Sequence, residues 1–187
     1  MRRISFLLVF LPLMSLSQSS FYIGTGLISS FANTVYDDQK YTSKNMLDFG
    51  LYYGNNLIIN DFIETVLEVF YLNNRLVLSR DGDKRFELHQ NIGFGIKPGV
   101  YYKKHSLHIN SGMLAVYVFD KDENLGNQLD YFDDSYFYGI DYNYDITQII
   151  SCNISFLSTN YESVSHWTDY VLKDFSVLQL TIQYKLY

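Results

Sequence analysis

The clearest pattern in the chain is an alternation of apolar and polar positions between Phe86 and Tyr102. Every second residue of this segment is apolar except Gln90, and the positions between them carry glycines, Tyr101 and polar side chains. The polar side chains are those of Glu87, His89, Asn91 and Lys97. Because successive side chains of a strand point to opposite faces, the segment predicts a long β-strand with one apolar and one polar face.

The same period recurs along the chain and predicts about eight antiparallel strands. Their expected ranges are 20–31, 45–54, 57–71, 85–102, 106–119, 135–145, 148–159 and 174–187. The connections alternate between short turns, at Asn55-Asn56, 103–105 and 145–147, and long loops, at 32–44, 72–84, 120–134 and 160–173. This arrangement is typical of a closed, up-and-down transmembrane β-barrel with both chain ends on the periplasmic side. The expected fold class is therefore all-β.

Periodicity does not say which face meets the solvent, because a soluble barrel such as a lipocalin has its apolar residues inside. Two features favour lipid. The polar face mixes glycines with charges of both signs, which suits a narrow filled lumen, and tyrosines gather near the strand ends as in an interfacial girdle. We therefore expect Phe86, Leu88, Ile92, Phe94 and Ile96 to face outward, and Glu87, His89, Asn91 and Lys97 to face the lumen. A soluble periplasmic ligand-binding barrel remains the alternative.

The first seventeen residues have the order of an export signal. Arg2 and Arg3 precede an apolar run from Ile4 to Met14, and small residues follow at 15–17. Eleven apolar residues are too few to span a bilayer as a helix, so we expect a signal peptide at 1–17 and the barrel domain at 18–187. No apolar stretch of eighteen residues follows.

Composition narrows the possible functions further. The chain has 18 Tyr and 14 Phe but only two Pro, a composition that suits long strands. The net charge of −6 gives no indication of a basic surface that would bind nucleic acid. Cys152 is the only cysteine, so an intramolecular disulfide and a cysteine-based zinc site are both excluded.

Three segments carry a resemblance to a known family: Phe21-Tyr22-Ile23-Gly24-Thr25-Gly26, the run 93–102, and the ending Gln183-Tyr184-Lys185-Leu186-Tyr187. They resemble the small outer-membrane barrels of the opacity and outer-membrane-protein-A-like superfamily, within the broader porin-like group. The resemblance implies residence in the outer membrane of a Gram-negative envelope, contact with its lipid and lipopolysaccharide, and insertion by the barrel-assembly machinery. It implies no cofactor and names no surface partner. Lys185 stands third from the end, where such barrels usually have an aromatic, so the final strand departs from the pattern.

Some barrels of similar size are lipid A 3-O-deacylases, which use a His, a Ser and a Glu. The nearest match here is the set Glu162, Ser163, Ser165 and His166. A nucleophile needs a base within hydrogen-bonding reach and a third group that orients the base. His166 directly follows Ser165, which reverses the family's order, so we expect a non-enzymatic barrel and keep a lipid-A-modifying hydrolase as the alternative.

The stretch Asp120-x-Asp122-x-Asn124 begins like a calcium-binding loop, because hard cations take spaced carboxylate and amide oxygens. Leu125 stands where such a loop needs Gly, and Tyr131 where it needs Glu. We therefore expect solvated surface acid here and no bound metal.

Charges inside a narrow barrel should pair with each other, since an unpaired buried charge is costly. Lys97 is expected to bind Glu64 or Glu68, with Asp48 as a substitute. Counting back from a loop at 72–84 puts Glu68 opposite Glu87 or His89. His89 is expected to be a hydrogen-bonded lumen residue. Eight strands leave an interior just wide enough for side chains, so no channel is implied. The expected role is a surface interaction of the loops or stabilisation of the envelope.

Overall fold

A computed structural model describes residues 18–36, 39–44, 47–80, 83–122, 126–164 and 169–186. The strands are β1 (Gln18–Tyr36), β2 (Gln39–Lys44), β3 (Leu47–Ile58), β4 (Ile63–Arg80), β5 (Asp83–Tyr102), β6 (His105–Asp122), β7 (Gly126–Asp145), β8 (Ile150–Val164) and β9 (Asp169–Leu186). The expected signal peptide, residues 1–17, lies outside the described residues. Within the described part, no helix is long and apolar enough to cross a membrane.

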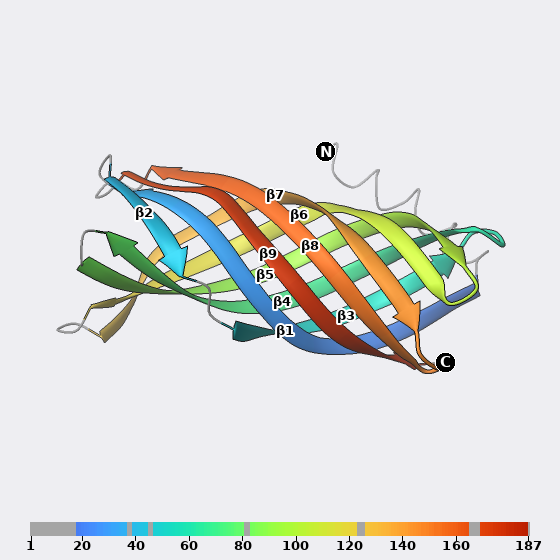
Figure 1. Ribbon diagram of the computed structural model, residues 1–187. Coiled ribbons are helices and arrows are strands. Elements are labelled where there is room, and N and C mark those ends of the chain that lie inside the picture. Colours follow the sequence, from blue (N-terminus) through green and yellow to red (C-terminus); the bar gives the residue numbers. More distant parts are fainter. Residues whose placement is uncertain are drawn as a thin grey trace.

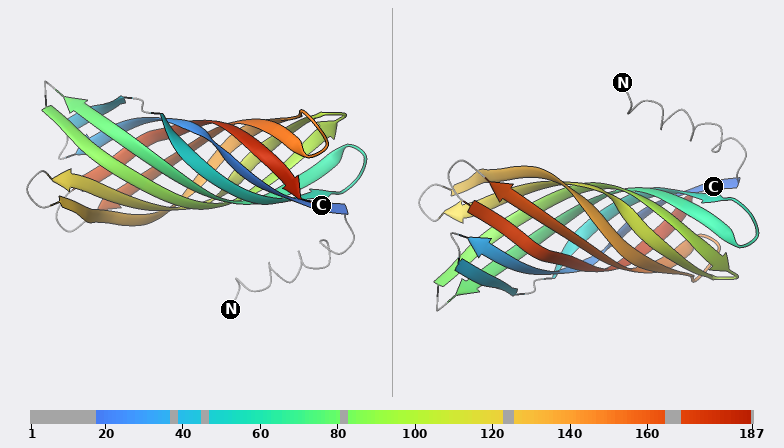
Figure 2. Two further views of the ribbon diagram at one scale, coloured as in Figure 1. Left: turned by 90° about the horizontal axis from the view of Figure 1, so that it is seen from below. Right: turned by 90° about the horizontal axis from the view of Figure 1, so that it is seen from above.

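The nine strand segments form a closed barrel with eight strand positions (Figures 1 and 2). β2 and β3 both run between β1 and β4, so they are two parts of one barrel strand. Every neighbouring pair is antiparallel, and β1 pairs with β9 from Phe21↔Leu186 to Tyr36↔Tyr170. Since β1 and β9 are the first and last strands, this ladder closes the sheet. The predicted closed antiparallel barrel of eight strands is confirmed.

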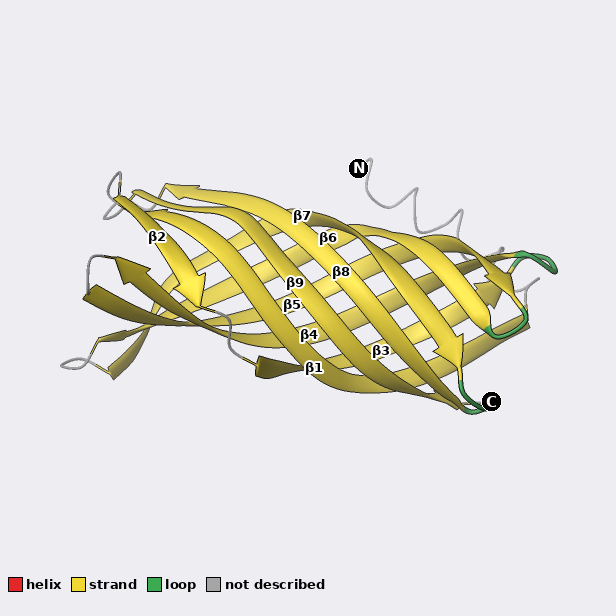
Figure 3. Ribbon diagram, viewed as in Figure 1, coloured by secondary structure: helices red, strands yellow, loops and turns green. Residues whose placement is uncertain are grey.

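The described turns all lie at one end of the barrel, beside the C-terminus (Figure 3). The first of them was predicted wrongly: Asn55 and Asn56 belong to β3, where they pair with Phe21 and Ser20 of β1. The chain reverses instead at residues 59–62. There the Asn60 side chain accepts hydrogen bonds from the backbone N–H groups of Phe62 and Ile63, both at 2.9 Å, as in an Asx-turn.

The predicted long loops are also mostly strand. β4 continues to Arg80 and β5 starts at Asp83, so 72–84 is largely ladder instead of loop. As a result Glu68 lies opposite Gly95, and not opposite Glu87 or His89 as the sequence count had it. The backbone groups of 72–80 and 83–84 are paired across the β4–β5 ladder, which satisfies them whatever their side chains.

The two faces of β5 are oriented as predicted. Ile92 and Phe94 are 48% and 47% exposed on the outside, whereas His89 and Asn91 are fully buried and Lys97 is 4% exposed. The side chains of Phe86 and Glu87 lie outside the described residues. Other strands share the outward apolar face, including Phe21, Ile23, Leu27, Phe49, Leu51, Val69, Leu107, Ile109, Ile140, Ile154, Phe156, Leu180 and Ile182. An apolar surface of this extent on the outside of a barrel with a polar lumen fits lipid and rejects the soluble alternative.

Replacing Ile140 with arginine should therefore destabilise the barrel by about 2–4 kcal/mol, because a cation at the bilayer midplane is costly. Ile140 is 58% exposed and lies halfway along the stretch of β7 that a tilted strand needs to cross a bilayer from its end at Asp145. Tyr136, 75% exposed, lies near the far interface, so Tyr136→Arg should cost only about 0–1 kcal/mol. The measurement is reversible urea unfolding in lipid vesicles. Equal costs at the two positions would contradict a bilayer centred near Ile140.

Candidate functional site in the lumen

The lumen has a polar region near the turn end and, further along the barrel, a region where large apolar side chains pack together with buried polar ones such as Asn74, Asn91 and Gln179. This second region is called the apolar region below. Inward-facing residues of β1, β3, β4, β5, β6, β7, β8 and β9 build both regions. The buried apolar cluster consists of Tyr22, Ile28, Tyr52, Val66, Phe70, Leu72, Leu114, Val116, Phe137, Leu157, Phe175 and Val177.

Lys97 is the centre of the polar region. Its Nζ lies 2.6 Å from Glu68 Oε1 and 2.6 Å from Asp141 Oδ2, and all three side chains are at most 5% exposed. Glu68 also accepts a hydrogen bond of 2.5 Å from the Tyr22 hydroxyl. The network thus ties β1, β4, β5 and β7 together across the barrel. Of the two predicted partners of Lys97, Glu68 is confirmed, and Asp141 is a second partner that the sequence reasoning did not name.

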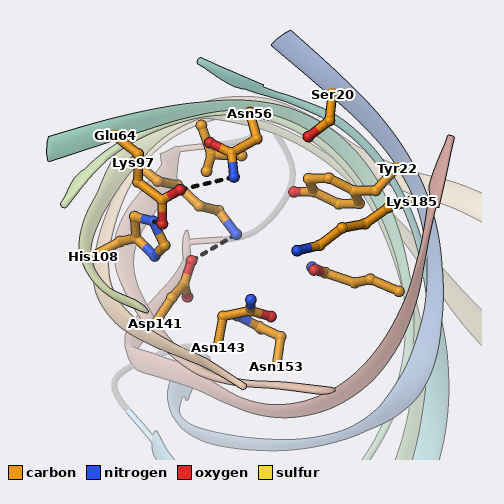
Figure 4. A pocket seen from close by; sticks show the side chains of 12 residues that line it. Ser20, Tyr22, Asn56, Glu64, Lys97, His108, Asp141, Asn143, Asn153 and Lys185 are labelled. Carbon is orange, nitrogen blue, oxygen red and sulfur yellow. Dashed lines mark hydrogen bonds and ion pairs between the residues drawn. The ribbon is translucent and has the colours of Figure 1, made fainter. Parts of the chain in front are cut away.

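Glu64 and Asp48, the other expected partners of Lys97, bind elsewhere. Glu64 lies 2.9 Å from His108 Nε2 and accepts a hydrogen bond of 2.8 Å from the Asn56 amide (Figure 4). Asp48 accepts hydrogen bonds from the backbone N–H and the guanidinium of Arg75, both at 2.6 Å. Glu64 and Glu68 lie opposite Gly99 and Gly95, each two positions from Lys97 along β5, so the register alone does not decide between them. Glu64 is instead bound by His108 and Asn56.

The sequence reasoning missed Asp141 and His108 as partners because each comes from a strand that is distant along the chain. Both residues occupy inward positions of well-formed alternating segments, and this alternation was the available signal. The alternation identifies the residues that face the lumen. It does not identify which of them meet, because that depends on the register and shear of the closed barrel.

The polar region opens towards the turn end. A cavity of about 30 Å³ lies among Tyr22, Lys97, His108 and Asp141, and Figure 4 shows these side chains converging on it. This volume holds about two water molecules. A larger cavity of about 260 Å³ lies at the mouth, beside the ion pair of 2.7 Å between Lys185 and Asp145. Asn56 Oδ1 and Asp141 Oδ1 are buried and have no protein partner, so water is the natural occupant of the smaller cavity.

The apolar region fills the barrel beyond this network. The Phe70 and Phe137 rings meet edge to face with their centroids 5.3 Å apart, and Val116 of the same cluster is fully buried. Further along, the His89 ring stacks on Phe175 at 6.1 Å. His89 is thus an inward, packed residue, as predicted. Together these side chains pack into the described part of the lumen.

The catalytic and metal candidates lie outside the part of the chain whose side chains are described. Glu162 and Ser163 lie in β8, and Asp120 and Asp122 in β6, but their side chains are outside the described residues. Ser165, His166 and Asn124 lie outside the described residues altogether. Among the described residues, no group of three His, Cys, Asp or Glu side chains is placed to hold a metal ion.

No family model matches this sequence, and no curated protein matches it. Solved structures do match its fold. Ail, the attachment invasion locus protein of Yersinia pestis, is 14% identical with a TM-score of 0.59, over 90% of this chain and 99% of Ail. The outer membrane protein OprG of Pseudomonas aeruginosa is 10% identical with a TM-score of 0.59, over 91% and 97%. Neisserial surface protein A is 11% identical with a TM-score of 0.58, over 90% and 99%.

The fold is that of a small outer-membrane β-barrel. The apolar exterior independently requires a bilayer around it, so the barrel is a membrane protein of the outer-membrane type. At these identities the likeness concerns the fold alone, and a role has to be argued from the chain's own residues.

Proposed function

We propose that this protein is a non-enzymatic outer-membrane barrel that acts through the end opposite its short turns. The observation that carries this proposal is the filled lumen: the charges of the polar region are paired and the rings of Phe70 and Phe137 cross the barrel beyond them. A filled lumen supports no conduction, and the belt around it faces lipid. The far end is then the surface left for contact with another molecule. β4, β5, β6 and β7 all extend into it as long hairpins.

The hairpin of β6 and β7 is the most acidic part of that end. Residues 118–134 include Asp120, Asp122, Glu123, Asp130, Asp133 and Asp134 but only one base, Lys121, for a net charge of −5. Ail has been solved with the heparin analogue sucrose octasulfate, which is a polyanion. The charge of this hairpin has the wrong sign for such a ligand. We propose a partner with a cationic surface, because complementary charge steers association and selects partners.

Neutralising four of these acids should weaken binding to polylysine about tenfold, if each exposed pair contributes about 0.3–0.5 kcal/mol. The variant is Asp120→Asn, Asp122→Asn, Glu123→Gln and Asp130→Asn, in barrels reconstituted in vesicles of neutral lipid. The matched control changes four other acids, each to Asn: Asp37, Asp38 and Asp81, which lie between strands, and Asp83, the first residue of β5. Wild-type binding should also fall with added salt. No binding of polylysine, or equal losses in both variants, would contradict the proposal.

The hydrolase alternative has its own test. Membranes that contain the wild-type barrel should leave the lipid A of radiolabelled lipopolysaccharide intact, as judged by mass spectrometry and by release of labelled fatty acid. Release that depends on Ser165 and His166 would show an enzyme and overturn the non-enzymatic role.

A further inference from the structure

The three described turns differ in charge. The β5–β6 turn consists of Lys103 and Lys104. The other two are Ile59-Asn60-Asp61-Phe62 and Ile146-Thr147-Gln148-Ile149, and neither contains a base. Both lysines are exposed. Within the described residues neither of them forms an ion pair, whereas Lys185 is held by Asp145 at 2.7 Å. Among the described residues of the turn end, Lys103 and Lys104 are therefore the lysines without an ion-pair partner, and they are adjacent in one turn.

The two flanking turns indicate where Lys103 and Lys104 lie relative to the membrane surface. Ile59 and Phe62 are 62% and 61% exposed, and Ile146 and Ile149 are 49% and 41% exposed. Four large apolar side chains at the tips of turns are unfavourable in water and favourable in the boundary region of a bilayer. We infer that the membrane surface reaches the turns themselves. Lys103 and Lys104 then lie at the level of the lipid phosphates.

The backbone conformation of this turn indicates that the Lys103 side chain has a function beyond forming the turn. Lys103 has a φ of 60°, and it is the one described non-glycine residue with a positive φ. Such a position in a two-residue hairpin turn is usually taken by Asn, Asp or Gly, which adopt it at less cost. A lysine is not what the turn geometry prefers, so its selection is better explained by the ammonium group.

Aromatic side chains surround the two lysines on the lipid side. The Lys103 Nζ lies 5.0 Å from the centroid of the Tyr102 ring, which is 61% exposed on the outside of β5. On β6, His105 Nδ1 lies 2.7 Å from the Tyr142 hydroxyl, and its ring centroid lies 5.1 Å from that of Tyr144. Amphipathic rings of this kind sit at the headgroup level of membranes. The aromatic rings therefore lie beside Lys103 and Lys104.

We propose that the β5–β6 turn binds the phosphate of an anionic phospholipid in the leaflet at the turn end. Lys103 and Lys104 contact the phosphate, and Tyr102, Tyr142 and Tyr144 pack against the glycerol and the first acyl carbons. Asp61 is a carboxylate of the neighbouring turn, which is joined to β5 by a hydrogen bond from the Tyr101 N–H to the Phe62 carbonyl. The proposal does not depend on the role of the far end.

The test is native mass spectrometry of the full barrel released from detergent with added phosphatidylglycerol or phosphatidylcholine. Wild-type protein should retain phosphatidylglycerol in preference to phosphatidylcholine. A basic residue near an anionic surface contributes about 1 kcal/mol, so Lys103→Gln with Lys104→Gln should weaken retention of phosphatidylglycerol by up to about 30-fold. The matched control, Lys84→Gln with Arg85→Gln, removes two bases near the opposite end of the same strand and should retain the lipid as wild type does.

Every outcome decides the proposal. Equal retention of the two lipids by wild type, or an equal loss in the control variant, would overturn it. Displacement of phosphatidylglycerol by inorganic phosphate at equal concentration would show a site for free phosphate and would also overturn it. The lysine variant should remain folded, since Lys103 and Lys104 are exposed, and a heat-dependent shift in gel mobility verifies the folding of both variants in the same samples.

Discussion

Replacing Lys97 with methionine should lower the free energy of unfolding by about 3–5 kcal/mol, which is the usual cost of removing one partner from a buried ion pair. The change leaves Glu68 and Asp141 inside the barrel with no cation between them, and both are at most 2% exposed. The measurement is the thermal midpoint in a gel-shift assay, together with urea unfolding in vesicles.

Two further variants make this result specific. Adding Glu68→Gln and Asp141→Asn to Lys97→Met should recover part of the lost stability, because the stranded charges are then gone. Lys185→Met is the matched control: its ion pair with Asp145 lies at the mouth, where the side chains are 16% and 29% exposed, and should contribute less than about 1 kcal/mol. An unchanged midpoint for Lys97→Met would mean that water reaches the Lys97 network freely.

Phe70→Ala should destabilise the barrel by about 3–5 kcal/mol, as is usual when a buried aromatic ring is removed from a packed interior. Phe70 is 2% exposed and its ring packs against Phe137 and Tyr52. It also covers Gly93 so closely that a side chain there would collide with it. The control is Phe94→Ala on the lipid face of β5, 47% exposed, where lipid fills the vacated space and the cost should be much smaller.

Gly93 provides an independent check of the same contact. Gly93→Ala alone should cost about 1–3 kcal/mol through overpacking against the Phe70 ring. In the Phe70→Ala background the added methyl group has room, so the double variant should be more stable than the sum of the two single changes predicts. Additive costs would contradict the direct contact between Phe70 and Gly93.

The sequence by itself determined the strands and their faces. The alternation along β5 correctly put Ile92 and Phe94 outside and His89, Asn91 and Lys97 inside, because side chains of a strand must alternate whatever the strand packs against. The cost of an unpaired buried charge was enough to predict that Lys97 is paired with Glu64 or Glu68, and Glu68 is the partner in the structure. These inferences needed only local geometry and the chemistry of single residues.

The tertiary structure alone decided the turn positions, the lengths of the strands and the partners across the lumen. Asn55 and Asn56 favour a turn locally, but they are held in β3 by their ladders to β1 and β4. The segment 72–84 is polar yet largely paired. Asp141 reaches Lys97, and His108 reaches Glu64, from strands that are brought together only when the sheet closes. Register and closure are properties of the whole ladder, so no local pattern of residues could specify them.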